Sequence, residues 1–173
     1  IALLFLAFWL RWKYATQVQL HVDEFTTLWA ATQVQANGAP IMPSGVLYTR
    51  GILSSYLVAF AQQLAGNSPL VGRSVSIIFG VAAVLTVFMV GRREWTARVG
   101  WVAAIGLTLL PEIIVWSGRA RFYSPLVFFS LLTMWAAFAM IRLPPSAQAE
   151  TWRVQWRTPL LFASMFVLAL FSQ

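Results

Sequence analysis

The chain has 173 residues, of which 60% are hydrophobic and only 10% are charged. A soluble domain carries roughly a quarter charged residues, so the composition predicts an integral membrane protein. The net charge is +7, but the arginines stand singly at the ends of apolar runs, and this argues against a nucleic-acid partner. The absence of cysteine excludes a disulfide framework, a thiolate metal site and a thiol nucleophile.

Both ends of the sequence lie inside apolar stretches, and the first residue is not methionine. We therefore expect residues 1–173 to be the N-terminal part of a longer protein. The predicted fold is all-α, a polytopic transmembrane helical bundle. In chain order it has the end of span 1 (1–12), an extracytoplasmic loop (13–72), span 2 (73–91), span 3 (97–118), span 4 (122–141), a cytoplasmic loop (142–157) and the start of span 5 (158–173). Pro111 and Glu112 interrupt the third span.

The segment 52–65 sits inside the predicted extracytoplasmic loop and is apolar but short. As a helix it would reach only about 21 Å, less than the ~30 Å hydrocarbon core of a bilayer. Its large apolar side chains share one helical face, while Ser55, Gln62 and Gln63 fall largely elsewhere. The pattern predicts an amphipathic juxtamembrane helix lying along the membrane interface.

The positive charges do not orient the spans by the positive-inside rule. Six fall on the predicted cytoplasmic side: Arg92, Arg93, Arg98, Arg142, Arg153 and Arg157. Six fall on the opposite side: Arg11, Lys13, Arg50, Arg73, Arg119 and Arg121. An anionic ligand would account for so many cations on the side that usually carries few.

Asp23 and Glu24 are the only adjacent acids, and His21 is the only histidine. Asp23 could be the N-cap of a helix, with Glu24 in its first turn. Acids this scarce beside a bilayer are also functional candidates, and the two roles can coexist. His21 could join Asp23 as a metal ligand.

Two arginines stand one residue apart in "WSGRARFYSP", residues 116–125. Arg119 and Arg121 could be membrane-edge anchors beside Tyr123, or they could bind one phosphate from a non-helical turn. Arg50 and Arg73 have the same two alternatives, and for Arg73 the alternative to phosphate binding includes pairing between helices.

Glu112 lies inside a predicted span, where an acid is a functional candidate by default. Its simpler role would be an ion pair with Arg119 or Arg121.

The order of these features resembles the lipid-dependent membrane glycosyltransferases of the GT-C fold, in the branch of protein O-mannosyltransferases and the aminoarabinose transferase of lipid A. The matching motifs, which cover nearly the whole chain, are Arg11, "DE" at 23–24, "YTRGIL" at 48–53, "GRSVS" at 72–76, "GRR" at 91–93 and "SGRARFY" at 117–123.

The resemblance implies transfer of a sugar from a polyprenyl-phosphate donor in the membrane lipid to a protein, lipid or glycan acceptor. Asp23 matches the catalytic acid, a general base on the acceptor hydroxyl, and Glu24 matches its neighbour. Arg50 stands where some members have a lysine that contacts the donor phosphate, and Arg121, with Arg119 beside it, matches an arginine near that phosphate. The implied course is a single displacement with inversion, at a site facing the extracytoplasmic side of the cell or plasma membrane.

The sequence departs from the family at two places. Gly51 and Ile52 replace a Pro-Pro pair, and no acid stands at Phe122 or Tyr123, where some members carry a second metal ligand. Whether the reaction needs a divalent metal therefore stays an open question. Two other functions also remain: a transporter or flippase for anionic lipids that uses the same arginines without bond chemistry, and a non-catalytic scaffold in which the charges are only anchors.

Overall fold

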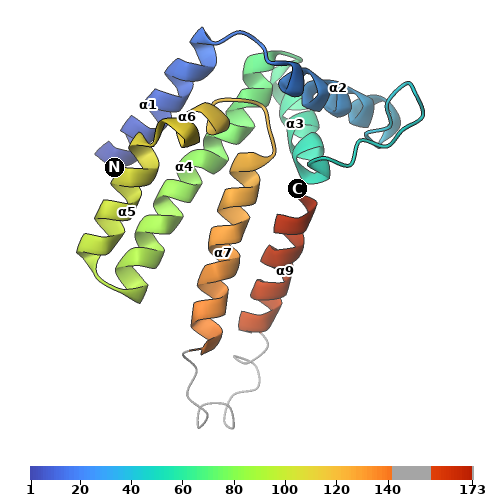
Figure 1. Cartoon of the computed structure of the whole chain (residues 1–173). Helices are drawn as coiled ribbons and strands as arrows, with labels where there is room; N and C mark the ends of the chain where they lie inside the picture. The colour runs from blue at the N-terminus through green and yellow to red at the C-terminus, as the bar shows by residue number, and fades with distance from the viewer. Residues whose placement is uncertain (142–156, 173) are drawn as a thin grey trace.

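The computed structural model describes residues 1–141 and 157–172. Within these ranges the chain forms eight α-helices, and this confirms the predicted all-α fold of membrane type (Figure 1). The predicted loop 142–157 lies outside the described residues except for Arg157, at which α9 begins.

Helix α4 (Pro69–Glu94) is the central element of the fold, and α1, α3, α5, α6 and α7 all contact it. It is longer at both ends than the predicted span 73–91. At its start, Ser68 Oγ accepts a hydrogen bond from Val71 N–H, and Pro69 occupies the first helical position, where proline is favoured. In the described part of the chain, α4 is the one unbroken helix long and apolar enough to cross a membrane.

Helix α5 (Ala97–Leu109) returns along α4. A Cβ added at Gly91 would lie 2.7 Å from Gly100 Cα, so two glycines let the two backbones approach closely where they turn. Helix α6 (Pro111–Ser117) follows at a bend of 64°. The break falls at the predicted Pro111, because proline removes the backbone donor that would continue α5.

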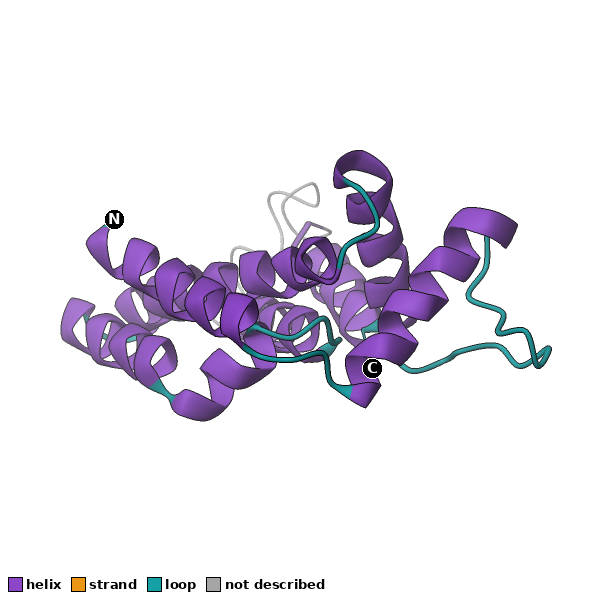
Figure 2. Ribbon diagram, turned by 90° about the horizontal axis from the view of Figure 1, so that it is seen from above, coloured by secondary structure: helices purple, strands orange, loops and turns teal. Residues whose placement is uncertain are grey.

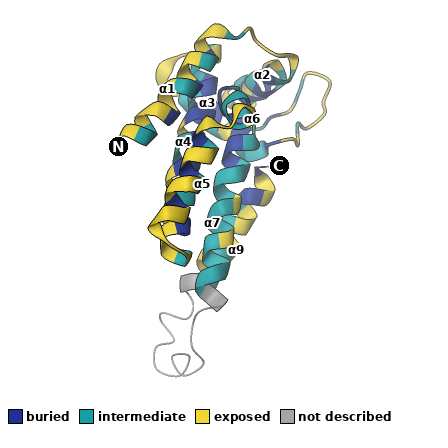
Figure 3. Cartoon of the chain, turned by 60° about the vertical axis from the view of Figure 1, so that its left-hand side comes forward, coloured by how far each residue is buried: buried dark blue, intermediate teal, exposed yellow. Residues whose placement is uncertain are grey.

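Helix α1 (Ala2–Gln17) continues beyond the predicted end of span 1 at residue 12. Arg11 lies within this helix and its side chain is fully buried. Helices α7 (Tyr123–Ile141) and α9 (Arg157–Phe171) pack against each other on the other side of α4 (Figures 1 and 3).

Helices α2 (Val22–Asn37) and α3 (Ile52–Ala65) pack together at one end of α4, and the loop between them projects from the helices (Figure 2). The bounds of α3 are those predicted. Its polar Ser54, Ser55 and Gln62 are buried, whereas Tyr56 and Phe60 are exposed. An outward apolar face of this kind suits contact with lipid, and the interfacial position of α3 stays a prediction.

Candidate active site

The site begins at the start of α2, where the N-cap is His21 and not Asp23. His21 Nδ1 accepts a hydrogen bond from Asp23 N–H at 3.3 Å, and Glu24 Oε2 accepts one from His21 N–H at 3.0 Å. These two bonds form a capping box. The prediction that Asp23 is the N-cap of α2 is therefore wrong, because the cap lies two residues earlier. The Asp23 carboxylate does not cap its own helix.

Glu24 forms a buried ion pair with Arg73 of α4. Arg73 Nε donates to Glu24 Oε1 at 2.8 Å, and Arg73 Nη2 donates to Glu24 Oε2 at 2.9 Å. Arg73 also donates to the main-chain oxygens of Ala15, Val18 and Gln19. This one guanidinium therefore joins the end of α1, the α1–α2 connection and α2 to α4.

The pKa of Glu24 reflects these contacts. Burial by itself would raise the pKa, but the hydrogen bonds from Arg73, Ala120 N–H and His21 N–H, together with the positive charge of Arg73, hold it below its ordinary value. Glu24 is consequently a carboxylate at neutral pH.

The catalytic role of Glu24 and phosphate binding by Arg73 stay predictions, and the structure places both groups inside the protein. The side chain of Glu24 is fully buried and that of Arg73 is 6% exposed. Both groups already have several partners within the protein, and neither lines the hollow described below. The sequence could not show this, because the two residues are 49 positions apart.

The turn between α6 and α7 is held in place by the same carboxylate. Ala120 N–H donates to Glu24 Oε1 at 2.9 Å, and Ser76 Oγ donates to the Arg121 main-chain oxygen at 3.0 Å. Since Asp23 precedes Glu24 and Arg121 follows Ala120, the buried pair fixes the backbone next to both of these side chains.

Asp23 and Arg121 meet above this buried pair. Arg121 Nη2 lies 3.8 Å from Asp23 Oδ2, and Arg121 Nη1 donates to the Asp23 main-chain oxygen at 2.9 Å. The Asp23 side chain is 50% exposed, whereas that of Arg121 is 5% exposed. The carboxylate is therefore accessible to a ligand, and the almost fully buried guanidinium lies beside it.

A hollow of about 290 Å³ opens at this point between α2 and the loop that precedes α3. Asp23, Arg50 and Arg121 all line it, so the structure brings together three of the residues predicted from the sequence. Arg121 Nε is buried and has no hydrogen-bond partner among the described residues. An anion in the hollow would find two positive charges and one half-exposed carboxylate.

Tyr48 is a site residue that the sequence analysis did not single out. Its hydroxyl lies 3.3 Å from Arg121 Nη1 and 3.4 Å from Thr26 Oγ1. Its place in the motif "YTRGIL" is the feature of the sequence that could have pointed to Tyr48. The contact of its hydroxyl with Arg121 depends on how the loop folds.

Gly51, one of the two residues that replace the family's Pro-Pro pair, has a left-handed backbone conformation. Its φ is 72°, which the proline ring cannot adopt, and a Cβ at this position would lie 2.6 Å from Phe122 Cβ. The start of α3 therefore packs directly on the residue that follows Arg121.

Arg119 is near the site but points elsewhere. Its Nε donates to the Tyr14 hydroxyl of α1 at 3.2 Å, and its guanidinium lies 5.6 Å from the centre of the Trp116 ring. Arg119 does not line the hollow that holds Arg50 and Arg121, so the two arginines of "SGRARFY" have separate surroundings.

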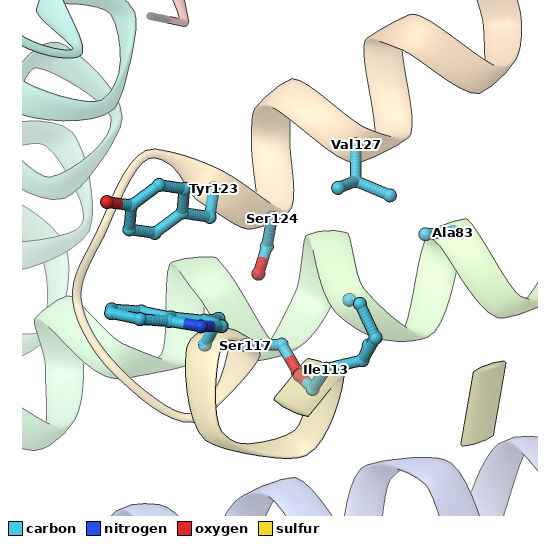
Figure 4. A pocket seen from close by; sticks show the side chains of 8 residues that line it. Ala83, Ile113, Ser117, Tyr123, Ser124 and Val127 are labelled. Atoms are coloured by element: carbon cyan, nitrogen blue, oxygen red, sulfur yellow. The ribbon is translucent and has the colours of Figure 1, made fainter. Parts of the chain in front are cut away.

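Tyr123 and Glu112 lie on the side of the α6–α7 turn that carries Trp116. The Tyr123 and Trp116 rings, 4.6 Å apart, border a pocket of about 160 Å³ that Ser117, Ser124 and Val127 also line (Figure 4). Glu112 accepts a hydrogen bond from Trp116 Nε1 at 3.0 Å. No ion pair joins Glu112 to either arginine in the part of the chain that the structure describes, contrary to the suggested pairing.

His21 Nδ1 lies 3.9 Å from Asp23 Oδ2. Among the described residues, no group of three or more histidine, aspartate or glutamate side chains could hold a metal ion. His21 acts here as the cap of α2, and a role as a metal ligand stays a prediction.

The fold is all-α and of membrane type, and a hollow lined by Arg50 and Arg121 lies beside the buried pair of Glu24 and Arg73. The family model of dolichyl-phosphate-mannose-protein mannosyltransferases matches residues 49–170, and the chain belongs to this family. The match includes Arg50, Arg73, Arg119 and Arg121, whereas Asp23 lies before it. No curated protein and no solved structure matches the chain.

Proposed function

We propose that this membrane glycosyltransferase moves a sugar from a polyprenyl-phosphate donor to an acceptor hydroxyl, and that the hollow at Asp23 is its reaction site. The observation that carries the proposal is the half-exposed Asp23 carboxylate, 3.8 Å from Arg121 Nη2 in a hollow that Arg50 also lines. The family description names a mannose donor and a protein acceptor. A lipid or glycan acceptor would meet the same chemical requirement of a free hydroxyl.

The arginines would bind the donor phosphate. A lipid-linked sugar keeps its hydrocarbon chain in the bilayer and its phosphate at the interface. When the bond to the anomeric carbon breaks, the phosphate takes the bonding electrons and gains negative charge. Arg121 and Arg50 would stabilise that charge, and donors fixed in advance contribute most to such stabilisation.

Asp23 would act as the general base. Its carboxylate takes the proton of the acceptor hydroxyl while the acceptor oxygen attacks the anomeric carbon from the face opposite the phosphate. One bond forms as the other breaks, so the configuration of the sugar inverts. General bases of this kind contribute about 100-fold to 10,000-fold in rate.

We propose that the site faces the extracytoplasmic side, at the end of α4 where α2 and α3 pack. In this proposal the chain is multi-pass. The end of α4 that packs on these helices faces the extracytoplasmic side. Arg92 and Arg93 at the other end of α4, and Arg98 at the start of α5, face the cytoplasm. The membrane lipid supplies the donor from the side.

The direct test measures sugar transfer by the full-length protein in proteoliposomes. Radiolabelled polyprenyl-phosphate sugars are offered with peptide, lipid and glycan acceptors, to the parent and to the Asp23→Asn variant. We expect transfer by the parent and a loss of about 100-fold or more in the variant. If donor lipid crosses the bilayer with its sugar intact and no product forms with any acceptor, the protein is a transporter and the proposal is wrong.

A further inference from the structure

Arg11 is a fully buried cation in the middle of the helical domain. Its Nη1 donates to the Ala7 main-chain oxygen at 2.9 Å, and its Nη2 donates to the Leu107 main-chain oxygen at 3.2 Å. No acidic side chain pairs with Arg11 among the described residues. An arginine in such surroundings is costly, and a specific task is expected of it.

The carbonyl of Leu107 can receive no helical N–H from residue 111, because that residue is proline. In a continuous helix, residue 111 would donate its N–H to the oxygen of residue 107, but proline has no N–H. The last regular bond of α5 runs from Leu110 N–H to Gly106 O at 2.9 Å, and the regular bonds resume in α6 with Ile114 N–H to Leu110 O at 3.1 Å. Among the carbonyls of α5 that lose their helical partners at the break, Arg11 therefore supplies a donor to that of Leu107.

Electrostatics favours a cation at this point. The last carbonyls of α5 form the negative end of its dipole, and a positive charge there is stabilising. Arginine also presents several N–H groups in a fixed plane, so one guanidinium can hold oxygens of α1 and α5 together. Lysine, with one nitrogen, would not reproduce this geometry.

The same face of α1 holds the other end of α6. Tyr14 lies one turn after Arg11, and its hydroxyl accepts the hydrogen bond from Arg119 Nε. A Cβ added at Gly118 would lie 2.5 Å from Tyr14 Cδ1. Arg11 thus holds the end of α5 and Tyr14 contacts the end of α6, and the turn that carries Arg121 follows directly.

Gly80 of α4 lies against both Arg11 and α6. A Cβ at this position would lie 3.0 Å from Arg11 Nε and 2.6 Å from Ser117 Cβ. The guanidinium and α6 can therefore approach α4 only because residue 80 has no side chain.

We propose that Arg11 is a positioning residue: it replaces the hydrogen bond lost at Pro111, holds the 64° bend between α5 and α6, and so places the turn of Arg121 over the reaction site. This inference rests on the proposed function only in its last step. The link between Arg11 and the bend stands independently of any activity.

Hydrogen exchange of the full-length protein in detergent tests that link. Arg11→Met removes a buried hydrogen bond to a charged group. In this variant the amides of residues 112–121 should exchange about tenfold faster or more. The amides of α2 and α3 should keep their rates. Lys13→Met is the matched control, because it removes an exposed cation two residues further along α1. Equal acceleration in every helix, or none at 112–121, would contradict the proposal.

A double-mutant cycle with Pro111→Ala tests the mechanism. An alanine at this position can donate its own N–H to the Leu107 oxygen, so Arg11→Met should accelerate exchange much less in that background than in the parent. An equal effect in the two backgrounds would show that Arg11 does not act through the freed carbonyl.

Kinetics test the last step. In Arg11→Met, the KM for the polyprenyl-phosphate sugar should rise while the KM for the acceptor stays unchanged, and Arg11→Lys should restore part of the loss. If the exchange results hold and donor KM does not move, Arg11 holds the bend without serving the donor site. If the parent transfers no sugar, the proposed function fails while the exchange results still decide the link between Arg11 and the bend.

Discussion

Asp23 Oδ2 and Arg121 Nη2 lie 3.8 Å apart although 98 positions separate the two residues in the sequence. The carboxylate is half exposed and the guanidinium is almost fully buried. A base must reach its substrate, whereas a phosphate-binding cation gains from a rigid setting. The difference in exposure between the two side chains fits this division of roles.

Arg121 should matter more to the donor than Arg119. In Arg121→Lys, the planar fork that contacts Asp23 and Tyr48 is lost, and the KM for the donor should rise about tenfold or more, since a hydrogen bond to a charged group contributes about 1.5–3 kcal/mol. Arg119→Lys should change it by a small factor, because Arg119 contacts Tyr14 outside the hollow. Arg98→Lys, at the start of α5, is the control. An equal rise for the two neighbours would show that both arginines bind the phosphate.

The buried pair of Glu24 and Arg73 should dominate the stability of the α1–α2–α4 junction. Glu24→Gln leaves the guanidinium without its counter-charge, and breaking a buried ion pair costs about 3–5 kcal/mol. Thermal unfolding in detergent measures the loss. Glu112→Gln is the comparison, because Glu112 is exposed and bonds only to Trp116, and it should stay within about 0.5 kcal/mol of the parent. A Glu24→Gln variant as stable as Glu112→Gln would contradict the role given to the pair.

The same pair predicts loss of stability in acid. The pKa of Glu24 is lower in the folded protein than in the unfolded chain. Its contribution is therefore complete above the ordinary value of about 4.3 and is lost as the pH falls through the folded value. The melting temperature of the parent should fall more steeply below about pH 4.3 than that of Glu24→Gln. Parallel curves for the two proteins would argue against this carboxylate as the cause.

Gly51 should tolerate no side chain, for two separable reasons. Gly51→Ala meets both the unfavourable φ of 72° and the contact with Phe122, whereas Gly45→Ala meets a φ of 81° with nothing within 4 Å. Each should lose about 1 kcal/mol for the backbone conformation. Only Gly51→Ala should also displace Phe122 and raise the donor KM through Arg121. Equal donor KM in the two variants would show that this contact does not position the site.

Local features were predictable from the sequence, and contacts between distant segments were not. The bounds of α3 follow from its apolar spacing between Gly51 and Gly66, and the break after α5 follows from Pro111. The sequence also singled out Asp23, Arg50 and Arg121, because charges are scarce in so apolar a chain. It could not show which of the two acids at 23 and 24 turns inward, since this depends on Arg73 and on Ala120.

Arg11 illustrates the same limit. A cation at the end of an apolar run predicts a membrane edge, yet α1 continues through Gln17 and the side chain is buried. The reason is the free carbonyl at Leu107, which only the packing of α1 on α5 and α6 brings within reach. Tyr48 was overlooked for a similar reason, because its contact with Arg121 crosses 73 positions.

The central claim is that Asp23 takes the acceptor proton and does not hold the donor. The most direct measurement is a single turnover with labelled donor bound beforehand to the full-length protein, for the parent and for Asp23→Asn, with the donor Kd measured for each. We predict that the variant binds donor with a Kd within about twofold of the parent and transfers sugar at least about 100-fold more slowly. Equal transfer rates, or a loss explained entirely by weaker donor binding, would contradict the assignment of Asp23 as the base.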